Sequence, residues 1–192
     1  MIKTINQTIG NMMKISNQYI GKQILSEIQI QSGVSQVAQQ LNKKFEDKSA
    51  IIITVVPGGI LFTADLVRKL DFPIAMETIS CPHTPGERHN RSDIVFHCNM
   101  DIIGQHIIII DDAIESGGTM KRLAAYINDN FAIKSLTIAT LFVKPNRIVI
   151  PFEQHFAYEM KNDDLLVGYG LPWNHQLRNI PYISTLINTE NK

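Results

Sequence analysis

Three acidic residues lie within five positions of one another, directly after a run of four isoleucines. The run is Ile107–Ile110, and Asp111, Asp112 and Glu115 follow it. Carboxylates this close repel one another unless a cation or a set of hydroxyl donors compensates for their charge. Oxygen ligands of this kind suit Mg²⁺, which usually keeps water and substrate phosphates in its shell. The spacing therefore favours a site for Mg²⁺ or for a ligand rich in hydroxyl groups.

The residues that follow are suited to binding an anion. Ser116, Gly117, Gly118 and Thr119 open a predicted helix that ends at Asn130. Glycines let backbone N–H groups converge on an anion, hydroxyls add donors, and the helix dipole favours negative charge. A plain glycine-rich helix start with Thr119 near the N-cap would carry the same four residues. Because two aspartates precede the segment, we predict a phosphate cradle, and it is not a P-loop because no Gly-Lys-Ser/Thr closes it.

Two further segments of the chain place unusual residues after a predicted buried strand. In open α/β sheets, ligands gather outside the carboxyl ends of the strands. Pro57, Gly58 and Gly59 follow one strand, and Lys144 follows another. The three predicted strands are short, nearly all apolar and rich in β-branched residues, as in a sheet covered on both faces: Ala50–Val56, Gln105–Ile110 and Ser135–Val143.

Helical patterns lie between the predicted strands. One apolar stripe runs from Val34 to Phe45 and starts after Ser32-Gly33, and a second helix is expected over residues 60–70. Alternation of strand and helix predicts right-handed crossovers and an α/β sheet. Residues 78–99 break this rhythm with a polar stretch punctuated by glycine and proline. Such a stretch is either a functional lid or a β-hairpin excursion without a catalytic role.

The composition excludes several classes of protein. With 18 Lys+Arg against 18 Asp+Glu, the formal charge is zero, which argues against a strongly basic nucleic-acid binder. Two cysteines cannot form a disulfide framework. No apolar run approaches the roughly 20 residues that span a bilayer, and the N-terminal segment lacks the apolar core of a signal peptide. We therefore expect a cytoplasmic protein with neither a nucleic acid nor a membrane as partner.

Three motifs, in order, carry a resemblance to a known family. Residues 107–119 resemble the phosphoribosyl-pyrophosphate motif of type I phosphoribosyltransferases. Residues 54–66 are similar to the pyrophosphate loop and following helix of the hypoxanthine(-guanine) phosphoribosyltransferases. Residues 166–174, with Arg178 shortly after, are similar to the C-terminal signature of that same subgroup. The resemblance covers roughly Ala50 to Leu186.

The resemblance implies a fold and a domain organisation. It implies the type I phosphoribosyltransferase fold, with a mostly parallel central sheet flanked by helices and a small hood formed by the N- and C-terminal segments. The whole chain, 1–192, would be one domain, with its core at about 34–150 and its hood at about 1–30 and 151–192. A flexible lid would span about 80–97 and begin with Ser80 and Cys81.

The resemblance also implies a role for each candidate residue. Glu115 would be catalytic and exchange the proton of purine N7. The remaining residues would bind the parts of the substrates: Asp111 and Asp112 the ribose hydroxyls and Mg²⁺; Ser116, Gly117, Gly118 and Thr119 the 5′-phosphate; Pro57, Gly58, Gly59 and Arg178 the pyrophosphate; and Lys144, Leu165, Leu166 and Pro172 the base, with Lys144 donating to its 6-oxo oxygen.

The implied activity is purine salvage. A magnesium-dependent enzyme, acting as a homodimer or homotetramer, would convert hypoxanthine, and guanine as well, with phosphoribosyl pyrophosphate to the nucleotide and pyrophosphate. A related transferase for xanthine or a pyrimidine is one alternative, and a non-catalytic sensor of phosphoribosyl pyrophosphate is another.

Several positions depart from the pattern of the family. Glu115 stands for its usual aspartate, Pro172 for another aspartate, and Leu165 for an aromatic ring that stacks on the base. Ser80-Cys81 replaces the Ser-Tyr of the lid. Pro57 replaces a polar or basic residue, and because an X–Pro bond makes the cis form accessible we predict that Val56–Pro57 is cis.

Overall fold

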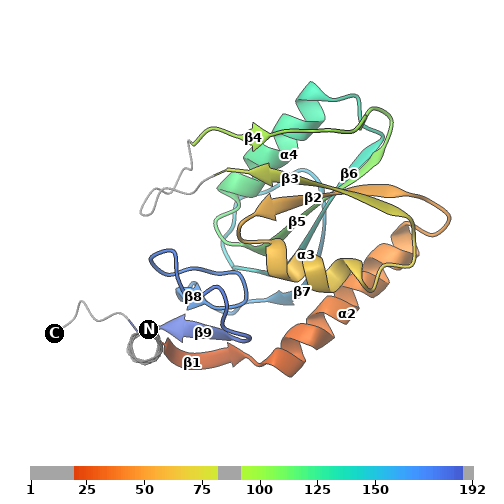
Figure 1. Cartoon of the computed structure of the whole chain (residues 1–192). Helices are drawn as coiled ribbons and strands as arrows, with labels where there is room; N and C mark the ends of the chain where they lie inside the picture. The colour runs from red at the N-terminus through yellow and green to blue at the C-terminus, as the bar shows by residue number, and fades with distance from the viewer. Residues whose placement is uncertain (1–19, 82–91, 188–192) are drawn as a thin grey trace, which may run out of the picture.

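The computed structural model describes residues 20–81 and 92–187, which form a larger and a smaller sheet with helices packed against the larger one (Figure 1). The strands are β1 (Ile20–Leu25), β2 (Ala50–Val56), β3 (Ile74–Ser80), β4 (Val95–Phe96), β5 (His106–Ile114), β6 (Ser135–Val143), β7 (Glu153–Glu159), β8 (Leu166–Val167) and β9 (Ile183–Leu186). The helices are α2 (Glu27–Lys44), α3 (Ile60–Val67) and α4 (Gly118–Asn130).

The central sheet is mostly parallel. Its six strands run in the order β4-β3-β2-β5-β6-β7, and every neighbouring pair is parallel except β3 with β4. Strand β2 lies between β3 and β5, with Ile51 opposite Ile107 and Thr54 opposite Ile110. The expected fold class is therefore confirmed, and parallel pairing brings the carboxyl ends of β2, β5 and β6 to one edge.

Each face of this sheet builds its own core. Ile108 and Ile110 belong to one buried cluster with α2 and α3, whereas Ile107 and Ile109 belong to a second cluster with α4. Successive side chains of a strand point to opposite faces, so a strand covered on both faces must be apolar at every position. This accounts for the unbroken isoleucine run before Asp111.

Strand β5 is longer than the sequence predicted. The expected strand ended at Ile110, but β5 continues to Ile114, with Asp111 opposite Thr140 and Ile114 opposite Val143. The extension forms because β6 runs on beside it and offers its backbone groups. The two aspartates are therefore strand residues, and the prediction that the strand ends before them was wrong.

Helix α2 begins seven residues before the predicted stripe, at Glu27 rather than Val34. Ser26 caps it, because its side chain accepts from the Gln29 N–H while the Gln29 side chain accepts from the Ser26 N–H. The sequence Ser32-Gly33 resembles a helix start, but Gly33 lies inside α2, where the helix packs closely on the sheet. A Cβ there would lie 2.6 Å from the Tyr158 ring and 2.9 Å from Leu141 Cδ1.

The other two helices differ from expectation by a few residues. Helix α3 ends at Val67 rather than Leu70, because the Lys69 and Leu70 N–H groups turn back to the carbonyls of Leu66 and Val67. Helix α4 begins at Gly118, one residue early.

Of the helices in the described part of the chain, none combines the length and hydropathy that a membrane crossing needs.

Strands β3 and β7 were not predicted. Both mix polar and apolar residues, which is typical of strands near the edges of a sheet and lacks the apolar runs of the central strands. The break placed at residue 78 is therefore wrong, since β3 continues to Ser80 and pairs with β4. Residues 82–91, the middle of the predicted lid, lie outside the described residues.

The smaller sheet joins the two ends of the described chain. Its strands run in the order β1-β9-β8, so residues 20–25 pair with residues 183–186 (Figure 1). Leu25, Leu166 and Ile183 from this sheet are buried in the core cluster of α2 and α3. This packing fixes the turn that follows β8, which reaches the candidate site described below.

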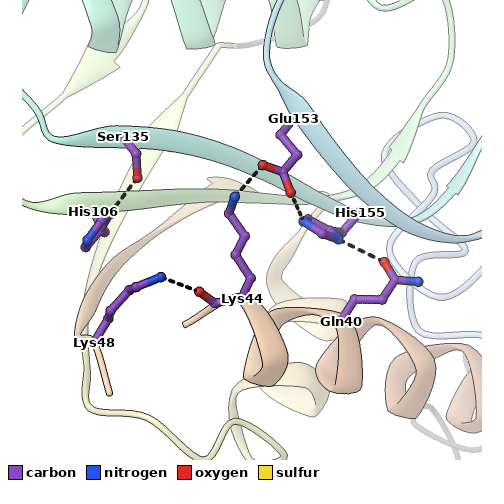
Figure 2. Close-up of polar contacts among 7 residues, drawn as sticks. All are labelled: Gln40, Lys44, Lys48, His106, Ser135, Glu153 and His155. Carbon is purple, nitrogen blue, oxygen red and sulfur yellow. Dashed lines mark hydrogen bonds and ion pairs between the residues drawn. The ribbon is translucent and has the colours of Figure 1, made fainter. Parts of the chain in front are cut away.

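Polar contacts tie α2 to the edge strand β7, as Figure 2 shows. His155 Nδ1 lies 3.0 Å from Gln40 Oε1, and His155 Nε2 lies 2.9 Å from Glu153 Oε1. Lys44 pairs with the same glutamate. Helix α2 is thus bound to β7 by its polar side chains as well as by its apolar stripe.

Replacement of Gly33 by alanine tests the close approach of α2 to the sheet. Alanine favours a helix over glycine by about 1 kcal/mol, but the added methyl group would overlap Tyr158 and Leu141. We expect Gly33→Ala to lower the free energy of unfolding by about 1–3 kcal/mol, measured by urea denaturation. Ser32→Ala is the matched control on the exposed face of α2, and equal stability of both variants would contradict the close approach.

Candidate active site

Two adjacent carboxylates lie at the carboxyl end of β5. Asp112 is 8% exposed, and its N–H donates to Asp111 Oδ1 over 2.9 Å. Burial raises the pKa of Asp112 to about 6, and burial followed by the charge of Asp112 raises the pKa of Asp111 well above its usual range. The pair is thus in an environment that resists two negative charges unless a cation or hydrogen-bond donors approach.

The loop between β2 and α3 lies directly against these carboxylates. The Val56–Pro57 peptide bond is cis, as predicted. A Cβ on Gly58 would lie 3.0 Å from Asp112 Oδ2 and 3.2 Å from Asp111 Oδ1. A Cβ on Gly59 would lie 2.8 Å from the Ile110 carbonyl oxygen. Glycine at both positions lets the backbone of this loop approach the end of β5 closely.

The turn after β8 completes this cluster from the other side. Gly170 has a φ of 102°, and a Cβ there would lie 2.5 Å from the Gly58 carbonyl oxygen and 2.8 Å from Asp112 Oδ2. The Gly170 N–H donates to the Arg178 carbonyl over 3.0 Å, and Arg178 Nη1 donates to the Gly170 carbonyl. The charge of Arg178 opposes the rise in pKa of both aspartates. Two loops distant in sequence therefore meet at Asp112, near the end of β5.

A second charged cluster adjoins the first. Lys144 follows β6 and its side chain is only 5% exposed, with Nζ 2.7 Å from Glu115 Oε1 and 3.4 Å from Asp163 Oδ1. The negative charge of Glu115 contributes to the raised pKa of Asp112, which links the two clusters. The side chain of Lys144 is therefore buried, unlike that of an ordinary surface lysine.

The predicted phosphate cradle forms the turn into α4. Gly117 has a φ of 86° and precedes the helix, and the Gly118 N–H lies 3.4 Å from Ser116 Oγ. The Ile148 N–H donates to the Ser116 carbonyl over 2.9 Å and fixes the turn. The N-cap residue of α4, Gly117, has no side chain that could cap the helix, and the first turn of α4 holds no acidic residue. The first-turn N–H groups are therefore suited to an anion.

The remaining predicted residues differ in their exposure and contacts. Leu165 is 46% exposed, as a residue that covers a ligand would be, whereas Leu166 is buried and pairs with Thr185. Pro172 is exposed. Ser80 ends β3, and the buried Cys81 lies beside α4, where Arg122 Nη1 is 3.6 Å from its Sγ. No described contact joins Ser80 or Cys81 to the aspartate pair.

Two residues of the clusters were missed as site residues in the sequence. Asp163 lies in a polar run, Lys161-Asn162-Asp163-Asp164, which is also typical of an ordinary surface turn. Gly170 belongs to the C-terminal motif, and a glycine between Tyr169 and Leu171 signals a backbone constraint without naming its partner. Only the tertiary arrangement brings both to the ends of the strands.

The aspartate pair fits a magnesium ion that also has ligands from a substrate. Its oxygen donors are of the hard type that Mg²⁺ prefers, and their burial favours a cation nearby. Within the described residues, no group of three or more His, Cys, Asp or Glu side chains is arranged to hold a metal ion. The protein donor set is thus too small for a closed metal site and suits an ion that keeps ligands from water and substrate.

One hollow of the described surface lies elsewhere. It has a volume of about 800 Å³ and is lined by residues at the end of α2 and just before β2 and β3, including Asn42, Lys48 and Phe72. Figure 2 shows Lys48 and His106 at that same end of the sheet. None of the candidate site residues lines this hollow, so it is separate from the candidate site.

Comparison with known proteins decides between families. A sequence model of the phosphoribosyl transferase domain matches residues 21–164. The chain belongs to the phosphoribosyltransferase family. A hypoxanthine-guanine phosphoribosyltransferase of Staphylococcus epidermidis is 29% identical over 165 residues, which cover 85% of this chain and 92% of that protein. The corresponding protein of Staphylococcus aureus shows the same identity and coverage.

Solved structures of phosphoribosyltransferases agree with this assignment. A hypoxanthine-guanine phosphoribosyltransferase of Bacillus anthracis superimposes with a TM-score of 0.77 at 27% identity, covering 88% of this chain and 99% of that one. A hypoxanthine phosphoribosyltransferase of Staphylococcus aureus gives a TM-score of 0.78 at 26% identity, covering 90% and 94%. The resemblance seen in the sequence and the expectation of a transferase enzyme are confirmed. Magnesium, the homo-oligomer and the cytoplasmic location stay predictions.

The buried Asp112 predicts that the candidate site lowers the stability of the folded protein at neutral and higher pH. Burial raises the folded-state pKa of Asp112 to about 6, so folding favours the protonated form of this side chain. The stability gained from that protonation is complete at pH values below the unfolded pKa and is lost as the pH rises through about 6. Asp112→Asn should therefore raise the free energy of unfolding at pH 8 by about 1–3 kcal/mol and change it little at pH 4. Urea denaturation at both pH values measures this.

The exposed Asp164 provides the control for this prediction. Asp164→Asn should leave the free energy of unfolding nearly unchanged at both pH values. If the free energy of unfolding of Asp112→Asn depends on pH as that of the wild type does, ionisation of the buried Asp112 does not destabilise the folded protein.

Proposed function

We propose that the protein transfers a phosphoribosyl group from phosphoribosyl pyrophosphate to hypoxanthine and guanine, releasing pyrophosphate. The observation that carries this proposal is the meeting of two charged clusters at the ends of β5 and β6. Asp112 contacts the loops of Gly58 and Gly170 in one cluster, and Lys144 pairs with Glu115 in the other. Relatives named for hypoxanthine and guanine support the choice of base.

The sugar lies at the aspartate pair in this proposal. Asp111 and Asp112 accept from the ribose 2′ and 3′ hydroxyls and would hold Mg²⁺. When bound, the ion supplies positive charge against the pyrophosphate. The 5′-phosphate is received by Ser116–Thr119, where the N–H groups of the first turn of α4 and the neighbouring hydroxyls donate to it. Two anchors on one ribose fix the direction in which its C1 faces.

The leaving group lies at the meeting of the other two loops. Displacement at C1 develops positive charge on the sugar, as in glycoside chemistry, and negative charge on the departing pyrophosphate. Arg178 and the backbone N–H groups of the 57–59 loop donate to that anion as its charge grows. The contacts of Gly58 and Gly170 around Asp112 support this placement because they bring the loop and the arginine to one side of the ribose site.

The base lies at the lysine. Lys144 donates to the 6-oxo oxygen of the purine, and Glu115 exchanges the N7 proton as N9 bonds to the sugar. Glu115 reaches Lys144 Nζ at 2.7 Å, so both groups are held at one edge of the base. Leu165 covers the ring with its exposed side chain, and the main chain at 166 and 172 meets the rest of the base edge.

A substrate assay tests this proposal directly. Nucleotide formation should be measured with hypoxanthine, guanine, xanthine, adenine and a pyrimidine, each with phosphoribosyl pyrophosphate, with and without Mg²⁺. We expect turnover with hypoxanthine and guanine only, and loss of turnover on chelation. Turnover confined to xanthine or a pyrimidine would reassign the base, whereas ligand binding without turnover of any base would favour a sensor.

The role of Glu115 is tested by a change that keeps its size. Glu115→Gln retains a hydrogen bond to Lys144 but cannot take a proton, so kcat should fall by about 10²–10⁴. The affinity for phosphoribosyl pyrophosphate, measured by calorimetry, should change little because the ribose anchors are intact. Glu159→Gln is the matched control, since Glu159 is 58% exposed against 50% for Glu115 and also pairs with a cation, Arg147. An unchanged kcat in Glu115→Gln would mean that another group handles the proton.

A further inference from the structure

Lys144 has one more carboxylate beside it than its charge requires. Its Nζ lies 2.7 Å from Glu115 and 3.4 Å from Asp163, and the lysine side chain is 5% exposed. One carboxylate suffices to neutralise a buried ammonium, so Glu115 alone meets the electrostatic need. Asp163 is 78% exposed, and an ion pair so open to water contributes little to stability. A second acceptor at this point therefore needs an explanation other than folding.

The fold holds Asp163 in this place from both sides. The loop that carries it starts at Met160, whose N–H donates to the Val143 carbonyl over 2.9 Å, directly before Lys144. It ends at Leu165, whose carbonyl accepts from the Leu186 N–H over 2.8 Å. Residues 161–165 between these anchors are exposed. Asp163 is thus kept beside the lysine on the side that a ligand can reach.

A hydrogen-bond donor beside an acceptor, as in Lys144 and Asp163, can distinguish one purine base from another. A 6-oxopurine presents an oxygen that accepts at C6 and an N–H that donates at the adjacent N1. Lys144 and Asp163 present the complementary donor and acceptor. Adenine presents the reverse, an amino group that donates at C6 and a bare nitrogen at N1, so both contacts would fail. Sites built to hydrogen-bond a particular group reject analogues without it strongly, because their own polar groups are left unpaired.

We infer that Asp163 is a specificity-determining residue, whose carboxylate accepts from N1–H of the purine while Lys144 donates to the 6-oxo oxygen. This inference rests on the proposed function and goes beyond it by assigning the reading of N1 to a side chain that no motif marks. In the absence of base the loose contact with Lys144 keeps the carboxylate aligned. In its presence Asp163 gains a charge-assisted hydrogen bond with N1.

The experiment compares Asp163→Ala, Asp163→Asn and the adjacent exposed control Asp164→Ala. Asp163→Ala should raise KM for hypoxanthine about tenfold or more, as expected for loss of a hydrogen bond to a charged group, with KM for phosphoribosyl pyrophosphate unchanged. The asparagine keeps a carbonyl acceptor and should recover part of the loss. Binding of the nucleotides with hypoxanthine and with adenine, measured by calorimetry, gives a readout independent of turnover.

A purely structural role would not alter the preference between the two bases. We expect Asp163→Ala to lower the ratio of hypoxanthine-nucleotide to adenine-nucleotide affinity about tenfold and Asp164→Ala to leave it unchanged. If the two alanine variants behave alike while the wild type turns over hypoxanthine, the inference is overturned and the proposed function stands. If the wild type turns over no 6-oxopurine, the proposed function fails, and the role of Asp163 fails with it.

Discussion

Two neighbouring carboxylates near the end of β5, Asp112 buried and Asp111 half-buried, are the constraint on which the surrounding structure depends. Asp111 and Asp112 cannot leave the site, because strand pairing with β6 continues past them to Ile114. Their charge must be met by groups that approach from loops elsewhere in the sequence. Glycine allows that approach at Gly170, where a Cβ would lie 2.5 Å from the Gly58 carbonyl oxygen, and eases it at Gly58. The loops after β2 and β8 are therefore shaped by the carboxylates they surround.

The sheet makes this convergence possible before any side chain contributes. Strands β2, β5 and β6 are parallel neighbours in register, so their carboxyl ends, each followed by a segment of the candidate site, lie at one edge. The smaller sheet adds the turn with Gly170 and Arg178, and it is placed by apolar packing of Leu166 and Ile183 on the core. Residues that meet at Asp112 are thus brought together by hydrophobic burial of distant strands.

The difference between local sequence patterns and contacts made only on folding explains which features could be predicted from the sequence. The central strands and the segments at 57–59 and 111–119 were predictable because an unbroken apolar run followed by glycine and acidic residues is a local pattern. Strands β3 and β7 escaped because their mixed composition lacks such a run, and the start of α2 was missed because Gly33 resembled a break. Asp163 was missed because its meaning lies in a partner 19 positions away, Lys144, whose contact exists only in the folded chain.

Charge is distributed in the site in a way that the net charge of zero conceals. Asp111, Asp112, Glu115 and Asp163 face Lys144 and Arg178, so the two clusters carry four carboxylates against two cations, a formal excess of two negative charges. A ligand as anionic as phosphoribosyl pyrophosphate would be repelled by that excess. Burial raises the pKa of both aspartates, and in the proposed function the same carboxylates would accept from the hydroxyls of the sugar. A divalent cation that arrived with such a ligand would offset the excess and would favour the ionised form of the carboxylates.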